Sequence, residues 1–418
     1  MNAAWSMSVP FWCFYIHQGM VTALIARGAG AYFRQQGWSL AALSYLSLAM
    51  LPWALKGLWA ATAEQHAVGL RGNRYLGSLA MLQLAMAAVM LITGHLTPAS
   101  APVYVVVALL ALATISATHD IFADGIVIGT TKPAARPLAS MAQVGGSYIG
   151  YMACPPLFLA VAEAGGWTAA LAALSVLSLL LLLPPLRLCQ PLSGRPHRRA
   201  PPSESGTSPH GTLSALWPAL CLAGIAYPAM RAMMALEAPL LIDLGLSLQE
   251  TGAVLALFAS GGSALGIVAG GWMARHLPPG AALQWICVCH ITIPAIGFVL
   301  YPMLGVAGWQ VLIVLGNLAA AAAFVVVYRL LMDQVRPSRP AADYALFQSI
   351  DAAVAVCMSL GALQLANLTG YRCVLALLAV LAVASCLAIF RLIPHLACAT
   401  TPAAAVLSET HPDEIPGA

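Results

Sequence analysis

The chain has 418 residues, of which 61% are hydrophobic and only 8% are charged. Soluble globular proteins carry about 25% charged residues, so this composition excludes an ordinary water-facing surface and indicates an integral membrane protein. The formal net charge of +4 does not indicate a nucleic-acid partner, because the basic residues lie in short loops between apolar runs.

Twelve apolar runs approach the length of about 20 residues that crosses a bilayer. In chain order they are Val9–Ala26, Leu40–Ala61, Tyr75–Thr93, Val103–Ile126, Met141–Val161, Thr168–Leu186, Leu213–Leu236, Thr251–Met273, Ala282–Leu304, Val311–Met332, Tyr344–Ala366 and Tyr371–Ile393. The first run lacks a charged leader and a small-residue cleavage site, so we expect a span and not a cleaved signal peptide.

A polar segment separates the sixth run from the seventh. Its sequence, RLCQPLSGRPHRRAPPSESGTSPHGT, is rich in Pro, Ser and Arg and is typical of a flexible linker. We therefore expect a six-helix half at residues 1–186, a linker at 187–212, a second six-helix half at 213–394 and a disordered cytoplasmic tail at 395–418. This layout resembles the major facilitator superfamily, an all-α membrane fold of 12 helices whose two halves surround a central cavity.

The distribution of Lys and Arg predicts the orientation, because cytoplasmic loops are enriched in both. If both termini are cytoplasmic, three of the 18 basic residues fall outside (Arg27, Arg34 and Arg372), two lie within spans (Lys56 and Arg231), and the other thirteen fall inside. The thirteen are Arg71, Arg74, Lys132, Arg136, Arg187, Arg195, Arg198, Arg199, Arg275, Arg329, Arg336, Arg339 and Arg391. We expect a multi-pass protein of the cell inner membrane.

Cysteine and glycine patterns indicate packing more than chemistry. Most of the ten cysteines lie inside apolar runs without a CxxC pair, so we expect small buried side chains and neither a metal site nor a cofactor. Glycines recur at four-residue spacing at 146 and 150, and again at 262, 266 and 270. This spacing lets two helix backbones approach closely in lipid.

Charged residues inside spans are costly and usually face a cavity or a partner. Asp120 and Asp124 share one helix face of the fourth run, and Asp120 lies about 25 Å along it at 1.5 Å per residue. Lys56 has a similar depth on the second run, which predicts an ion pair between Lys56 and Asp120. The pair would serve either transport or the structure of an inward gate.

Two stretches resemble motifs of the AmpG-like branch of the superfamily: Leu51-Pro52 to Lys56 and Leu58-Trp59-Ala60, and Ala117-Thr118 to Asp120 and Asp124. That branch includes muropeptide permeases, acetyl-coenzyme A transporters and RhtX/FptX/YbtX-like siderophore (metallophore) permeases, and the short chain and Asp124-Gly125 look more like the siderophore group. The resemblance implies functional roles for Lys56, Asp120 and Asp124. The acidic-basic pair usual after Leu-Trp-Ala is replaced by Ala63-Glu64-Gln65-His66, so we expect a differently built loop gate.

Four further residues are candidates for substrate or proton binding. The resemblance implies that the first, fourth, seventh and tenth helices line the cavity, flanked by the eleventh. His17 on the first run is then either a substrate contact or a satisfied structural residue, and Gln348 and Asp351 lie near the midplane of the eleventh run. Asp351 has no expected partner within one turn except Gln348 and is a candidate proton carrier. Arg231, expected near the periplasmic end of the seventh run, either attracts an anionic substrate or snorkels to the interface.

These patterns predict a proton-coupled secondary transporter that imports a siderophore or metal chelate, with the muropeptide permease as the nearest alternative. The partners expected are a small molecule and membrane lipid, and we expect a monomer. The chain contains no GxxxxGK[ST], HExxH or GxSxG motif, which disfavours ATP-driven transport and an enzyme. A drug efflux pump is less favoured, because the fifth run has no G-P-x-x-G-G signature.

Overall fold

The computed structural model describes residues 2–38, 49–96, 98, 102–188, 209–301 and 303–398. These residues are helical apart from loops, turns and one isolated bridge between Leu70 and Asn73. Within them, ten helical stretches are long and apolar enough to cross a membrane, and one of these, 133–187, contains two of the predicted runs.

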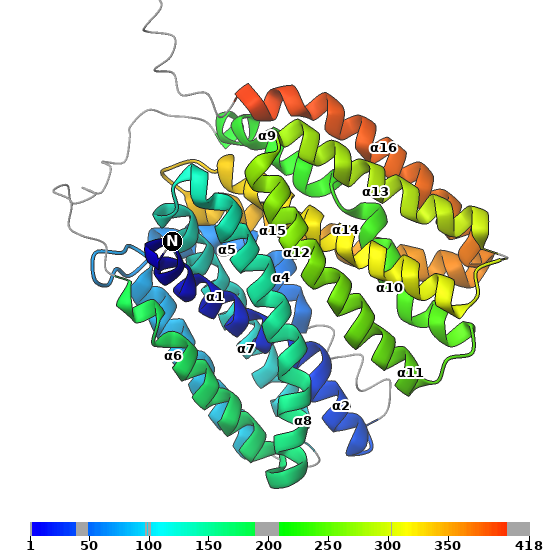
Figure 1. Ribbon diagram of the computed structural model, residues 1–418. Coiled ribbons are helices and arrows are strands. Elements are labelled where there is room, and N and C mark those ends of the chain that lie inside the picture. Colours follow the sequence, from blue (N-terminus) through cyan, green and yellow to red (C-terminus); the bar gives the residue numbers. More distant parts are fainter. Residues whose placement is uncertain are drawn as a thin grey trace, which may run out of the picture.

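The N-terminal half contains α1 (Asn2–Ala23), a π turn (Leu24–Gly28), α2 (Ala29–Gln35), α4 (Leu51–Leu55), α5 (Gly57–Gln65), α6 (Leu76–His95), α7 (Pro102–Thr130) and α8 (Arg136–Leu182). The C-terminal half contains α9 (Pro209–Ile225), α10 (Pro228–Asp243), α11 (Leu248–Ala253), a π turn (Val254–Ala259), α12 (Ser260–His276), α13 (Pro279–Leu300), α14 (Val306–Asp333), α15 (Pro340–Thr369) and α16 (Tyr371–Cys398). Figure 1 shows α1, α6, α7 and α8 on one side of the molecule and α10, α13, α14 and α16 on the other.

Four of the predicted runs differ from expectation or are described only in part. The first helix continues through the π turn and α2 to Gln35, well beyond the expected end at Ala26, because no proline or polar break interrupts it before Gly37, whose φ is +87°. The second run is described only from residue 49 onward. It forms α4 and α5, which meet at Lys56. The fifth and sixth runs join within α8 at Gly166, whose φ of +79° and ψ of 179° break the helix. Glycine adopts this backbone geometry without a Cβ clash.

The seventh run also differs, and the difference moves one candidate residue. Pro228 has no N–H to donate, so the helix is interrupted between α9 and α10 and resumes until Asp243. The expected end at Leu236 is therefore wrong. Arg231 lies near the middle of the span Leu216–Asp243, and the prediction that it lies near the periplasmic end is also wrong.

The predicted linker, 187–212, and tail, 395–418, fall mostly outside the described residues. α9 begins at Pro209, inside the predicted linker, and α16 continues through Cys398, inside the predicted tail. We use "linker end" for the end of the bundle where the 187–209 connection joins the two halves, and "far end" for the opposite one.

The glycine pattern has the packing role expected of it. A Cβ at Gly146 or Gly150 on α8 would collide with α1, at Tyr15 and at the backbone of Ile16 respectively. On α12, Cβ atoms at 262, 266 and 270 would collide with the backbone of α14. Each half thus contains one tightly packed helix pair that depends on small residues.

Candidate functional site

The two halves are joined by polar contacts that lie at the linker end and extend to the middle of the bundle. The Gly57 N–H donates to Ser349 Oγ (2.8 Å), the Ser140 hydroxyl donates to the Val325 carbonyl (2.7 Å), and Tyr344 donates to Gln143 Oε1 (2.8 Å). In this conformation the described halves are therefore closed toward the linker end.

Lys56 is the centre of the first charged group. Its ammonium donates to Asp120 Oδ2 within the N-terminal half and to Gln348 Oε1 of α15 in the C-terminal half. Lys56 is 2% exposed and Asp120 is 1% exposed, so the pair is shielded from solvent. The predicted ion pair between these residues is confirmed, and Gln348 is its third member.

Asp124, one turn beyond Asp120, has only neutral partners. Tyr15 donates to Asp124 Oδ1 at 2.7 Å, and Gln143 Nε2 donates to the same oxygen at 3.0 Å. Asp124 Oδ2 and Asp120 Oδ1 are buried and have no hydrogen-bond partner. Among the described residues, these two carboxylates one turn apart therefore share one neighbouring cation, Lys56.

The second charged group lies in the C-terminal half and corrects an expectation. Asp351 was predicted to lack a partner other than Gln348, but Arg231 Nη2 donates to Asp351 Oδ2 at 2.6 Å and Arg231 Nε donates to Oδ1 at 3.3 Å. Tyr328 donates to the same carboxylate at 3.2 Å. The Arg231 guanidinium also lies 4.5 Å from the ring centre of Phe324, a cation–π distance. Arg231 is therefore a partly buried ion-pair partner in the middle of its span and does not snorkel to the interface.

α15 brings both charged groups together, because Gln348 and Asp351 are three residues apart on one helix face. We call the combined set the central polar group. Its members are Tyr15, Lys56, Asp120, Asp124, Gln143, Arg231, Tyr328, Tyr344, Gln348 and Asp351. It holds two cations and three carboxylates.

His17 belongs to a separate buried cluster inside the N-terminal half. Its Nε2 is hydrogen-bonded to Ser178 Oγ at 2.8 Å, and its ring centre lies 5.2 Å from that of His119. His119 is hydrogen-bonded to Gln83 at 3.2 Å. His17 is fully buried, and this geometry fits the structural alternative better than a substrate contact.

Glu64 shows how the altered loop gate is built. Its Oε2 accepts the Ala342 N–H at the first turn of α15 (2.8 Å), and its Oε1 accepts the Tyr75 hydroxyl (2.5 Å). The pKa of Tyr75 is raised mainly by burial and also by the nearby Glu64 carboxylate. The Tyr75 hydroxyl therefore keeps its proton and donates a hydrogen bond to Glu64. A carboxylate at a helix N-terminus is favourable because unpaired N–H groups and the helix dipole point toward it. Glu64 thus caps a helix of the other half.

Two more ion-pair groups strengthen the linker end. Asp333 binds Arg136 of the other half at 2.5 Å and also binds Arg329, four residues before it, at 3.2 Å. Arg336 makes two side-chain hydrogen bonds to Asp343 and donates its backbone N–H to it as well. The Asp343 hydrogen bonds raise the pKa of Arg336, which keeps this pair charged.

Three members of the central polar group, Gln143, Tyr328 and Tyr344, were not predicted, and Tyr15 was expected only as an aromatic that could stack on a substrate. Each is an uncharged polar residue inside an apolar run, where packing or interface roles are the usual interpretation. Tyr344 and Gln143 both lie near the start of a predicted run. Because neither is charged, the pattern of charged residues inside spans does not point to them. Within the described residues, no three His, Cys, Asp or Glu side chains are grouped closely enough to hold a metal ion.

Comparison with solved structures finds this fold in membrane transporters. A bacterial homologue of the iron transporter ferroportin, in its outward-facing state, superimposes with a TM-score of 0.68 at 11% identity, covering 93% of this chain and 99% of that one. The same homologue with soaked iron gives a TM-score of 0.67 at 11% identity, covering 93% and 98%. The human organic anion transporter MFSD10 (TETRAN) gives 0.65 at 15% identity, covering 93% and 99%.

At 11% to 15% sequence identity, these structural matches show the fold alone and do not identify the transported molecule. The expected all-α fold of two six-helix halves is confirmed. The sequence profile of the Major Facilitator Superfamily matches residues 11–350, most of the length of the chain. The protein is a multi-span membrane transporter, not an enzyme, and it belongs to the Major Facilitator Superfamily.

Proposed function

We propose that this transporter is a proton-coupled importer of a siderophore or another small anionic metal chelate across the cell inner membrane. One observation carries the proposal: the cations Lys56 and Arg231 bind Gln348 and Asp351, which lie three residues apart on α15, and each cation is held by an exchangeable carboxylate or amide. Carboxylate, hydroxamate and catecholate oxygens of a chelate are chemically suited to replace those partners. The motif resemblance around Lys56 and Asp120 supports the same cargo class.

The proposed direction depends on orientation. With the linker end in the cytoplasm, as the Lys and Arg distribution favours, the present conformation is closed on the cytoplasmic side. A substrate from the periplasm would then reach the central polar group first, and rearrangement of the ion pairs would accompany opening of the linker end. A reporter active only in the cytoplasm, fused after Arg199, should be active; a periplasmic signal there would reverse the proposal.

Proton coupling is assigned to Asp124. Asp120 and Asp351 each have a cationic partner, whereas Asp124 has only Tyr15 and Gln143. A carboxylate buried in a span without its own cation is stabilised by taking up a proton. This replaces the expectation that Asp351 is the carrier.

The cargo is tested by uptake into cells that lack the gene, with and without the plasmid-borne protein. Labelled ferric and zinc siderophores are compared with labelled anhydromuropeptides, and an ionophore that collapses the proton gradient is added in parallel. We expect gradient-dependent uptake of at least one chelate and none of the muropeptide. Uptake of muropeptide alone would favour the permease alternative, and lower accumulation with the protein than without it would indicate efflux.

A further inference from the structure

Glu237 on α10 is a buried carboxyl group that the proposed transport site does not use. It is 8% exposed, and Asn317 Nδ2 of α14 donates to its Oε1 at 2.7 Å. Among the described residues, it has no Lys, Arg or His partner within ion-pair distance. Because an unpaired carboxylate in a span is costly, Glu237 holds a proton or faces a bound cation.

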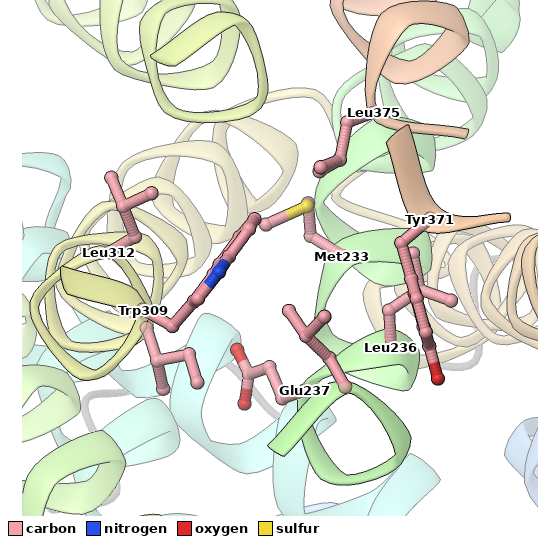
Figure 2. Close-up of a pocket in the computed structure, with 9 residues that line it drawn as sticks. Met233, Leu236, Glu237, Trp309, Leu312, Tyr371 and Leu375 are labelled. Carbon is pink, nitrogen blue, oxygen red and sulfur yellow. The ribbon is translucent and has the colours of Figure 1, made fainter. Parts of the chain in front are cut away.

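Two cavities adjoin this carboxyl group. The first is narrow in this conformation and is lined by Met233, Leu236, Leu240, Trp309, Leu312, Ile313, Tyr371 and Leu375 together with Glu237. Figure 2 shows Trp309 and Tyr371 on opposite sides of this space, with Met233 and Leu375 above it and Glu237 below. The walls are apolar or aromatic, so they favour a hydrophobic ring.

The second cavity is also narrow; it shares Met233, Glu237 and Leu312 with the first and adds His290 of α13. His290 Nε2 is buried and has no hydrogen-bond partner. The carboxyl group and the imidazole nitrogen are therefore two hydrogen-bond acceptors that face one apolar space. An ammonium group supplies both a positive charge and several N–H donors, which fits this pair.

We propose that Glu237 and His290 form a binding site for a hydrophobic primary amine, separate from the central polar group. The ammonium binds Glu237 and His290, and the aromatic body packs between Trp309 and Tyr371. Trp309 lies in the first turn of α14 and Tyr371 is the first residue of α16, so the site opens toward the far end. The proposal does not depend on the chelate or on its direction of transport.

Amine binding is linked to one proton. If Glu237 is neutral in the empty site, the incoming ammonium displaces its proton, which leaves to solvent, and an ion pair remains. The other ionisable groups around it are His290, Tyr371 and Tyr148, and Arg231 on the same helix is paired with Asp351. Amine affinity should therefore rise by up to tenfold per pH unit while Glu237 is protonated and the amine is charged.

The test uses the purified full-length chain in lipid nanodiscs and three fluorescent naphthalene probes. They are 1-(aminomethyl)naphthalene, the neutral 1-naphthalenemethanol and the quaternary trimethyl(1-naphthylmethyl)ammonium ion. We expect saturable binding of the primary amine at least tenfold tighter than that of the alcohol, and the quaternary ion in between because it has no N–H donor. Saturation with one proton released per amine, followed with a pH-sensitive dye, would support displacement.

Variants separate this site from partitioning into lipid. Glu237→Gln retains an acceptor for Asn317, so folding should be preserved, and it should lose at least tenfold in amine affinity while the alcohol binds as before. His290→Ala should weaken the amine severalfold, and Glu163→Gln on the exposed surface of α8 should change nothing. Equal affinities for amine and alcohol, or equal amine binding by wild type and Glu237→Gln, would overturn the proposal. Unchanged chelate uptake by Glu237→Gln would leave the proposed function intact and show that the two sites are independent.

Discussion

The Arg231 guanidinium donates two hydrogen bonds to the Asp351 carboxylate, one from Nη2 to Oδ2 at 2.6 Å and one from Nε to Oδ1 at 3.3 Å. The two residues are 120 positions apart and lie on different helices of the same half. Each charge in this pair is the counter-charge of the other, so removing either one leaves its partner without compensation inside the span. Asp351 is therefore better suited to hold Arg231 for the substrate than to carry a proton.

Neutralising one member of this pair should be worse than neutralising both. Arg231→Gln or Asp351→Asn alone leaves an uncompensated buried charge, at a cost on the order of 3 kcal/mol. The double variant removes both charges and should recover part of the thermal stability of the purified protein, while transport remains lost. Additive losses in this double-mutant cycle would show that the two residues do not interact in the membrane.

Lys56 and Asp120 form a second ion pair that a double-mutant cycle can test. Here the two single variants should differ in how much membrane-inserted protein they lose. Lys56→Met leaves Asp120 unpaired, and Asp120→Asn leaves Lys56 with Gln348 as its remaining hydrogen-bond partner. The first variant should therefore lose more membrane-inserted protein than the second, and the double variant should recover expression. Expression is measured by fluorescence of a fused reporter after detergent extraction. Equal losses in both single variants would argue that Gln348 does not support Lys56.

Close helix packing in the C-terminal half depends on particular glycines of α12. A Cβ at Gly266 would collide with the Leu318 carbonyl, whereas one at Gly261 would meet nothing within 4 Å. We expect Gly266→Ala to lower the melting temperature markedly, by pushing α12 away from α14. Gly261→Ala on the same helix should be neutral or slightly stabilising, by up to about 1 kcal/mol from helix propensity. A neutral Gly266→Ala would mean that α12 and α14 are not packed this closely.

The gate at the linker end should weaken when Glu64 loses its carboxylate. Glu64→Ala leaves the Ala342 N–H and the Tyr75 hydroxyl without their shared acceptor. We expect faster trypsin cleavage after Arg71 and Arg74, identified by mass spectrometry, because this exposed loop adjoins Tyr75 and opens more often without the Glu64 contact. Glu64→Gln keeps an acceptor and should have a smaller effect, and Glu163→Gln should have none. Cleavage unchanged in Glu64→Ala would exclude the cap as a gate element.

Depth along a helix is predictable from sequence, and this explains the successful part of the site prediction. Lys56 and Asp120 were paired because rise per residue gives both a similar depth and their motifs resemble one family. The same reasoning misplaced Arg231, because Pro228 interrupts an apolar run without changing its composition. Hydropathy therefore locates a span but not a break inside it.

Which residues lie side by side on different helices is harder to predict than their depth. Whether Arg231 faces Asp351, or Glu64 faces the start of α15, depends on helix rotation and on how the halves meet, and single-sequence periodicity does not encode either. Uncharged members such as Tyr15 and Gln143 give no signal, because polar residues inside spans also serve packing. For His17 the sequence left a substrate contact and a structural role open, and its hydrogen bond to Ser178 favours the structural role.

The last prediction concerns Asp124 as the proton carrier. Tyr15 and Gln143 both donate to its Oδ1, an oxygen that asparagine also provides, so Asp124→Asn should keep the fold and both hydrogen bonds. Asparagine does not titrate and resembles the protonated state permanently. In proteoliposomes, the variant should exchange the chelate identified by uptake across the bilayer at a rate independent of pH.

Uphill accumulation driven by a proton gradient should be abolished in the same variant, since no proton is bound on one side and released on the other. Glu163→Gln, the same chemical change at an exposed position, is the matched control and should accumulate chelate normally. If Asp124→Asn accumulates chelate as well as wild type, the proton binds elsewhere. Asp120 then becomes the next carboxylate to test, and because Asp120→Asn also frees Lys56, that test must be made together with Lys56→Met.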